Sequence, residues 1–229
     1  MRKIFKRAVS FFLIPATRWY LQKERSYNYE GIKVKVPSTV FHPGLFPSTR
    51  FLLLYLKNHN LNNKTFLELG CGSGLISVWA AKQNASVFAC DLNPKAVETC
   101  GTNAKENQVQ VKVFHSDLLD SLPKIQFDWI VINPPYYSKK VVNDEELAWN
   151  CGENFEYFQK LFSTLADFIH KDSKIVMVLT QGCDVNSIKL VASSSGFEFV
   201  LKAEQSVLFD GRDFIFEISF TQKTLSRKV

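Results

Sequence analysis

Short apolar runs alternate along the chain with segments whose apolar residues recur every three to four positions. The short runs predict strands over residues 65–69, 86–90, 109–114, 127–132 and 174–179. Between them, helical spacing predicts helices from residue 75 onward and over residues 94–107, 153–170 and 185–195. Upstream lie a predicted strand at 30–36, a proline-rich loop at 41–49, and a helix for which Ser48 or Thr49 is a suitable N-cap residue.

Strands that alternate with helices form a parallel sheet, because each helix crosses over in a right-handed sense and lets the next strand run in the same direction. The helices then cover both faces of the sheet. Two more runs, at residues 197–203 and 214–220, flank a turn at Asp210-Gly211 and predict a final hairpin. This hairpin adds one antiparallel strand. We therefore expect an α/β fold with a seven-stranded, mostly parallel sheet, one antiparallel strand and helices on both faces.

The composition fits one such domain. A chain of 229 residues with 46% apolar residues can bury one sizeable core. We place the domain at residues 30–221, with a basic arm or helix at 1–29 and a flexible tail at 222–229. The five cysteines form no Cys-x-x-Cys pair and the four histidines stand apart. We therefore expect reduced thiols in a cytoplasmic protein and no metal site.

The net charge of +6 is concentrated at the N-terminus. Residues 1–25 contain seven basic residues and one acidic residue, whereas the rest of the chain contains 21 of each kind. A signal peptide is disfavoured, because the apolar run at 8–16 is short, contains Pro15 and is followed by Arg18. No run is long enough to span a bilayer. The arm is either a surface helix that contacts RNA, an acidic partner or membrane headgroups, or a helix packed on the domain.

A glycine-rich loop follows the first strand of the predicted sheet. The sequence from residue 65 reads Thr-Phe-Leu-Glu-Leu-Gly-Cys-Gly-Ser-Gly-Leu, with glycines at Gly70, Gly72 and Gly74. Glycine lets backbone N–H groups and a helix N-terminus approach a ligand closely. A dinucleotide fingerprint would need a glycine in place of Leu75, and a phosphate-binding loop would need Gly-Lys-Ser/Thr. The spacing is similar to the first motif of the class I S-adenosylmethionine methyltransferases.

Polar residues mark the ends of four successive strands, and in a parallel sheet these ends line the ligand site. Glu68 lies in the first strand. Asp91 ends the second, where a carboxylate can accept hydrogen bonds from both ribose hydroxyls. Asp117 follows the third strand and is a candidate acceptor for an adenine amine, although the same acid could be a helix cap. Asn133 ends the fourth strand.

The fourth strand runs into Asn-Pro-Pro-Tyr-Tyr, from Asn133 to Tyr137. A plain strand-ending turn also favours Asn-Pro, but it does not explain why an acceptor side chain, a rigid carbonyl and an aromatic ring occur together. Two prolines fix φ and remove two N–H groups, which leaves carbonyl acceptors. We expect Asn133 Oδ1 and the Pro134 carbonyl to accept the hydrogens of a planar –NH₂ group on which Tyr136 stacks. Such positioning can contribute ~7–11 kcal/mol.

Together these motifs resemble those of the S-adenosylmethionine-dependent amino-methyltransferases. Leu-Glu-Leu-Gly-Cys-Gly-Ser-Gly, Asp-Leu-Asn-Pro and Asn-Pro-Pro-Tyr are most similar to the HemK-type glutamine methyltransferases and the related "small" methyltransferase domain, over about residues 30–220. The resemblance implies a Rossmann-like class I methyltransferase fold with S-adenosylmethionine as cofactor. The cofactor-binding residues that it implies are Glu68, Gly70, Cys71, Gly72, Gly74, Asp91, Leu92, Asp117, Leu118 and Asn133.

The resemblance also implies where the substrate lies. Asn133, Pro134 and Tyr136 would hold the target nitrogen, and the loop at 41–49 corresponds to the family's proline-rich loop. The substrate-flanking residues are then Phe46, Ser48, Thr49, Pro135 and Tyr137. The chain departs from the glutamine enzymes in two ways: this loop lacks their usual acid, and a short basic arm stands in place of their N-terminal helical bundle.

The expected function is methyl transfer to a planar nitrogen, with a protein glutamine side chain (N5) as the first substrate hypothesis. The alternative substrate is the adenine-N6 or guanine-N2 amine of ribosomal or transfer RNA. The basic arm would favour RNA through phosphate contacts, and Tyr136 or Tyr137 through stacking. A non-catalytic cofactor-binding scaffold and a nicotinamide oxidoreductase are the remaining hypotheses.

Overall fold

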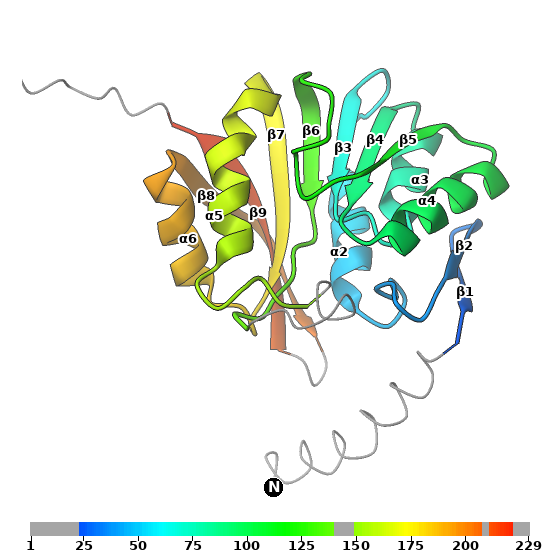
Figure 1. Cartoon of the computed structure of the whole chain (residues 1–229), viewed down its shortest axis with the longest axis horizontal. Coiled ribbons are helices and arrows are strands. Elements are labelled where there is room, and N and C mark those ends of the chain that lie inside the picture. Colours follow the sequence, from blue (N-terminus) through cyan, green and yellow to red (C-terminus); the bar gives the residue numbers. More distant parts are fainter. Residues whose placement is uncertain (1–22, 140–148, 208–210, 222–229) are drawn as a thin grey trace, which may run out of the picture.

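The computed structural model describes residues 23–139, 149–207 and 211–221. The predicted arm up to residue 22, the tail from residue 222 and Asp210 of the predicted turn lie outside this part of the chain. Seven strands form one sheet (Figure 1). They are β3 (Thr65–Leu69), β4 (Ser86–Asp91), β5 (Val111–His115), β6 (Phe127–Ile132), β7 (Ile169–Thr180), β8 (Phe197–Val207) and β9 (Gly211–Phe220).

The strand order is β5-β4-β3-β6-β7-β9-β8. The five strands from β5 to β7 pair in parallel. Strand β9 is antiparallel to both of its neighbours, β7 and β8. The expected mostly parallel sheet with one antiparallel strand is therefore confirmed, and its order places β3 and β6 side by side at the centre.

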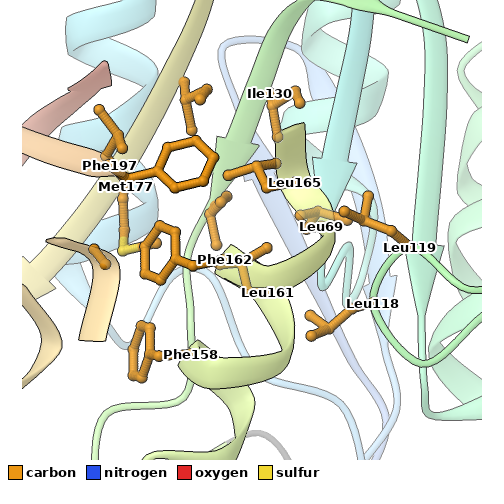
Figure 2. Packing of buried hydrophobic residues seen from close by; sticks show 14 of the residues in the cluster. Leu69, Leu118, Leu119, Ile130, Phe158, Leu161, Phe162, Leu165, Met177 and Phe197 are labelled. Carbon is orange, nitrogen blue, oxygen red and sulfur yellow. The ribbon is translucent and has the colours of Figure 1, made fainter. Parts of the chain in front are cut away.

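Helices cover both faces of the sheet. Alternate residues of each strand point to opposite sides, so apolar side chains on both faces are buried by helices. Phe66 packs in a cluster with α2 (Pro47–Leu56), α3 (Leu75–Lys82) and α4 (Pro94–Glu106). Leu67 and Leu69 pack in a second cluster with α5 (Glu156–Thr164) and α6 (Val185–Ser194). Figure 2 shows this second cluster, in which Phe162 of α5 lies beside Met177 and Phe197 of the sheet.

A separate antiparallel pair precedes the seven-stranded sheet along the chain. It consists of β1 (Arg25–Tyr29) and β2 (Ile32–Val36). Only β2 was predicted; β1 falls within the range expected to be a basic arm or helix. The pair is fixed on α4 by side-chain amides, since Asn103 and Asn107 bond the backbone of Lys35 and Lys33. The sequence of β1 carries a weak apolar signal, and its strand conformation depends on pairing with β2.

Several other predictions were wrong in detail. The final strands are longer than the predicted 197–203 and 214–220, since β8 runs to Val207 and β9 starts at Gly211. The helix expected over 153–170 ends at Thr164, continues as the short 3₁₀ helix η2 (Leu165–Phe168), and gives way to β7, which begins five residues before its predicted start. Neither Ser48 nor Thr49 caps α2, because its N-cap is Phe46 and both residues lie inside the first turn. None of the helices in the described residues is long and apolar enough to cross a bilayer.

Candidate active site

The carboxyl ends of β3, β4, β5 and β6 open into a cavity of about 340 Å³, a size within the range of small-molecule sites. Most of the residues predicted from the sequence line it. They are Thr49, Glu68, Gly70, Cys71, Gly72, Asp91, Leu92, Asp117, Leu118, Asn133, Pro134, Pro135 and Tyr136. The remaining four, Phe46, Ser48, Gly74 and Tyr137, lie behind or beside its wall.

The glycine loop forms the wall nearest β3. Gly70, Gly72 and Gly74 all have positive φ, of 73°, 50° and 76°, which side chains disfavour. The N–H groups of Gly70 and Cys71 donate to the Cys90 carbonyl at 2.9 and 3.0 Å, and this fixes the loop against β4. At Gly74 a Cβ would lie 2.5 Å from Cys100 Sγ, so the close packing of the loop on α4 requires glycine.

Asp91 is held rigidly at the end of β4. One carboxylate oxygen accepts from the Gly72 N–H and the other from the Asn93 N–H, both at 2.9 Å. Burial raises the pKa of Asp91, although these N–H groups partly compensate. Each carboxylate oxygen has a second lone pair, so the group can still accept hydrogen bonds from a ligand in the cavity.

Glu68 is a buried acid in the wall of the cavity, with 5% of its surface exposed. Its carboxylate accepts from both the N–H and the hydroxyl of Ser77, in the first turn of α3. Burial outweighs these bonds and raises the pKa of Glu68 to about 8. The cavity is also lined by Asp91, Asp117 and Glu156, against one lysine, Lys160. This charge balance suits a ligand that carries positive charge.

Glu68 is expected to make stability depend on pH. Its pKa is higher in the folded protein than its ordinary value of 4.5, so its contribution is fully present below pH 4.5 and is lost as the pH rises through about 8. Glu68→Gln keeps the shape and an acceptor oxygen but cannot titrate. Urea unfolding from pH 4.5 to 8 should show wild type losing stability relative to Glu68→Gln, and parallel pH curves would contradict the burial argument.

Lys160 was not predicted. It lies on α5 and places Nζ 2.6 Å from Oδ2 of both Asp117 and Asp120. Lys160 therefore ties α5 to the loop after β5, beside the cavity. A single lysine on the polar side of a helix carries no sequence signal for such a role. The expected bond between Asp117 and an adenine amine stays a prediction. In the structure the Asp117 carboxylate is ion-paired with Lys160.

The catalytic candidates are joined by hydrogen bonds to α2. Tyr136 is buried, with 7% of its surface exposed, and its hydroxyl lies 2.8 Å from Ser48 Oγ and 2.5 Å from Asn133 Oδ1. Asn133 Nδ2 lies 3.5 Å from Ser48 Oγ and 3.4 Å from Thr49 Oγ1. Asn133 therefore lines the cavity with its amide oriented by three hydroxyl groups. The sequence indicated the motif but not these partners.

An aromatic cluster flanks the same site. The rings of Phe41 and Phe46 stack at 4.6 Å, and Trp149 packs on them at 5.2 and 4.8 Å. Phe41 lines the cavity, whereas Tyr137 is 45% exposed beside it. The loop at 41–49 thus flanks the cavity as expected, with Phe41 and Trp149 as residues that the sequence did not single out.

The arrangement fits a cofactor with a cationic centre and a nucleoside. The glycine loop leaves room for close approach, Asp91 offers fixed acceptor oxygens, and the lining is acidic. The family model described as Methyltransferase small domain matches residues 31–200. The chain belongs to this family. It is an S-adenosylmethionine-dependent methyltransferase, and the expected enzyme class, fold and cofactor are thereby confirmed.

Relatives of this methyltransferase have different substrates in their names. A Methanocaldococcus jannaschii protein named "Putative protein N5-glutamine methyltransferase" is 31% identical over 193 residues, which are 79% of this chain and 92% of that protein. The ribosomal protein L11 methyltransferase of Thermotoga petrophila is 37% identical over 112 residues, 48% of this chain and 42% of that protein. This methyltransferase therefore spans less than half of the L11 enzyme.

A solved structure shows the same fold at low identity. The T. thermophilus 16S rRNA N2 G1207 methyltransferase, in complex with AdoMet and guanosine, superposes with a TM-score of 0.61 at 18% identity. The match covers 85% of this methyltransferase and 50% of that chain. At this identity the likeness concerns the architecture of the domain.

Proposed function

We propose that this methyltransferase methylates a planar nitrogen, and that its substrate is the side-chain amide of a protein glutamine. The observation that carries the proposal is the placement of Asn133, Pro134 and Tyr136 together in the wall of the cavity, beside the glycine loop. An amide nitrogen is a weak nucleophile, because its lone pair is delocalised. The site must therefore hold the amide and favour charge on its nitrogen.

The residues of this site have separate tasks in the proposed reaction. S-Adenosylmethionine, when bound, supplies an electrophilic methyl group. Glu68, the glycine loop and Asp91 would hold the cofactor. Asn133 Oδ1 and the Pro134 carbonyl would accept the two amide hydrogens of the substrate and return electron density to its nitrogen. No strong general base is needed, since the proton can leave after transfer.

The protein substrate is supported by the M. jannaschii relative, whose name specifies protein N5-glutamine methylation and of which this chain covers 92%. Five free and buried cysteines fit a reducing compartment such as the cytoplasm. The proposed acceptor pair, Asn133 Oδ1 and the Pro134 carbonyl, would bind any planar –NH₂ group. The class of substrate therefore depends on which macromolecule binds to the surface around the cavity.

RNA is the second candidate, and one observation favours it. The described chain begins at Lys23, next to β1, and Tyr27 of β1 packs on His42 of the loop at 41–49 with ring centroids 5.8 Å apart. Arg25 of β1 lies near the same loop, since the pKa of His42 is lowered by burial and, to a smaller extent, by the charge of Arg25. Cationic side chains at such a place would favour phosphates.

The test is transfer of tritiated methyl groups from S-adenosylmethionine into an extract of the source cells, followed by separate digestion with protease and with ribonuclease. Release of label by protease, and recovery of N5-methylglutamine after complete enzymatic hydrolysis, is the expected result. Release by ribonuclease would assign the RNA amine instead. No label in any macromolecule, although the cofactor binds, would overturn the proposal of a protein or RNA substrate.

A further inference from the structure

Two hydroxyl groups in the first turn of α2 have no role in the helix. Ser48 and Thr49 are buried, with 2% and 5% of their surfaces exposed, and no side chain caps the start of α2. Buried hydroxyls need hydrogen-bond partners. The hydrogen-bond partners of Ser48 and Thr49 are side chains of the Asn-Pro-Pro-Tyr segment, 84 to 88 residues away along the chain.

Tyr136 has one hydroxyl proton and two oxygens within reach. Ser48 Oγ lies 2.8 Å away and Asn133 Oδ1 lies 2.5 Å away. Burial raises the pKa of Tyr136, so the phenol stays protonated at physiological pH. A buried donor without a partner is costly. The proton must therefore go to one of these two oxygens.

The choice affects catalysis, because Asn133 Oδ1 is also the proposed acceptor for the substrate amide. When the phenol donates to Oδ1, it occupies one of the two lone pairs of that oxygen and withdraws electron density from the other, which must accept from the substrate. When it donates to Ser48 Oγ, both lone pairs of Oδ1 are available to the substrate. Thr49 differs from Ser48 in this respect, since its hydroxyl contacts Asn133 Nδ2 and not the phenol.

We propose that Ser48 is a positioning residue that frees Asn133 for the substrate by serving as the alternative acceptor for the Tyr136 hydroxyl. Without substrate, the phenol can bond Asn133. With substrate, it turns to Ser48, and Asn133 Oδ1 accepts the incoming N–H. This inference rests on the proposed methylation of a planar nitrogen and adds a residue outside the cavity lining to that mechanism.

The test is a set of paired substitutions, assayed as label transfer into the extract proteins that wild type methylates. Ser48→Ala leaves the phenol to compete for Asn133, so kcat should fall on the order of tenfold, the effect of one hydrogen bond. Adding Tyr136→Phe removes the competing donor. The double variant should therefore be faster than Ser48→Ala alone, which a merely structural role for Ser48 would not produce.

Thr49→Ala is the matched control, with and without Tyr136→Phe. Thr49 is the neighbouring buried hydroxyl, but its contact is with Nδ2, so Tyr136→Phe should give no gain in this background. Calorimetric titration with S-adenosylmethionine shows whether each variant keeps an intact cofactor site. Transfer by wild type without a gain in the Ser48 pair would overturn the inference. No transfer by wild type would overturn the proposed function itself.

Discussion

Asn133→Ala is expected to lower kcat by about 10²- to 10³-fold, the usual effect of removing one pre-positioned polar group from an active site. The loss follows from the role proposed for Asn133 Oδ1, which would accept a hydrogen bond from the substrate amide and which alanine lacks. S-Adenosylmethionine should still bind, although without the contact implied for Asn133, because the glycine loop and Asp91 hold their positions through bonds that do not involve this residue. Steady-state kinetics and calorimetry measure the two quantities separately.

Asn58→Ala is the control for this substitution. Asn58 is an exposed asparagine just after the end of α2, and its side-chain amide donates to the Leu54 carbonyl inside that helix. Its removal should leave kcat unchanged. If Asn133→Ala retained wild-type kcat, the assignment of Asn133 as the substrate-holding acceptor would be wrong, and the site would have to act through other groups.

Gly74→Ala is expected to destabilise the protein by about 2–5 kcal/mol, through left-handed backbone strain and overpacking. The added Cβ would lie 2.5 Å from Cys100 Sγ and 3.1 Å from the Cys100 backbone, at a φ of 76°. Relief would require the glycine loop to move away from α4 and so to distort the cofactor site. Urea unfolding and titration with S-adenosylmethionine should therefore show losses of both stability and affinity.

Gly101→Ala, in the helix α4 against which the glycine loop packs, is expected to have the opposite effect on stability. Gly101 lies inside α4, and a Cβ there would meet no atom within 4 Å. Alanine should stabilise the protein by roughly 0.5–1 kcal/mol, because glycine is unfavourable in a helix interior. Similar effects of the two substitutions would show that the approach of the loop to α4 is not tight.

Several elements followed directly from local sequence. Strand β6 has the predicted bounds. Asn93 caps α4, with its side chain accepting from the Lys95 N–H at 2.9 Å and Pro94 next in the chain. The glycine loop and the acids at strand ends were also apparent. In each case the signal lies within a few residues, because caps, turns and apolar periods are local properties of the backbone.

The contacts made by the site residues did not follow in this way. Lys160 reaches Asp117 and Asp120 across 43 and 40 residues of sequence, and β2 is bonded by Asn103 and Asn107 from 68 and 74 residues away. A helical pattern continued through residue 169, yet the chain entered β7 there, because pairing with β6 prevailed over the local period. Such outcomes depend on which surfaces meet.

The sequence by itself determined the succession of strands and helices in the main sheet, the glycine loop and the set of polar groups at one edge of the sheet. Only the tertiary structure decided how those groups are paired. Ser48 and Tyr136 are 88 residues apart and still share a hydrogen bond in the wall of the cavity. The physical reason is that backbone conformation responds to near neighbours, whereas the partner of a buried polar group is chosen by the packing of whole elements.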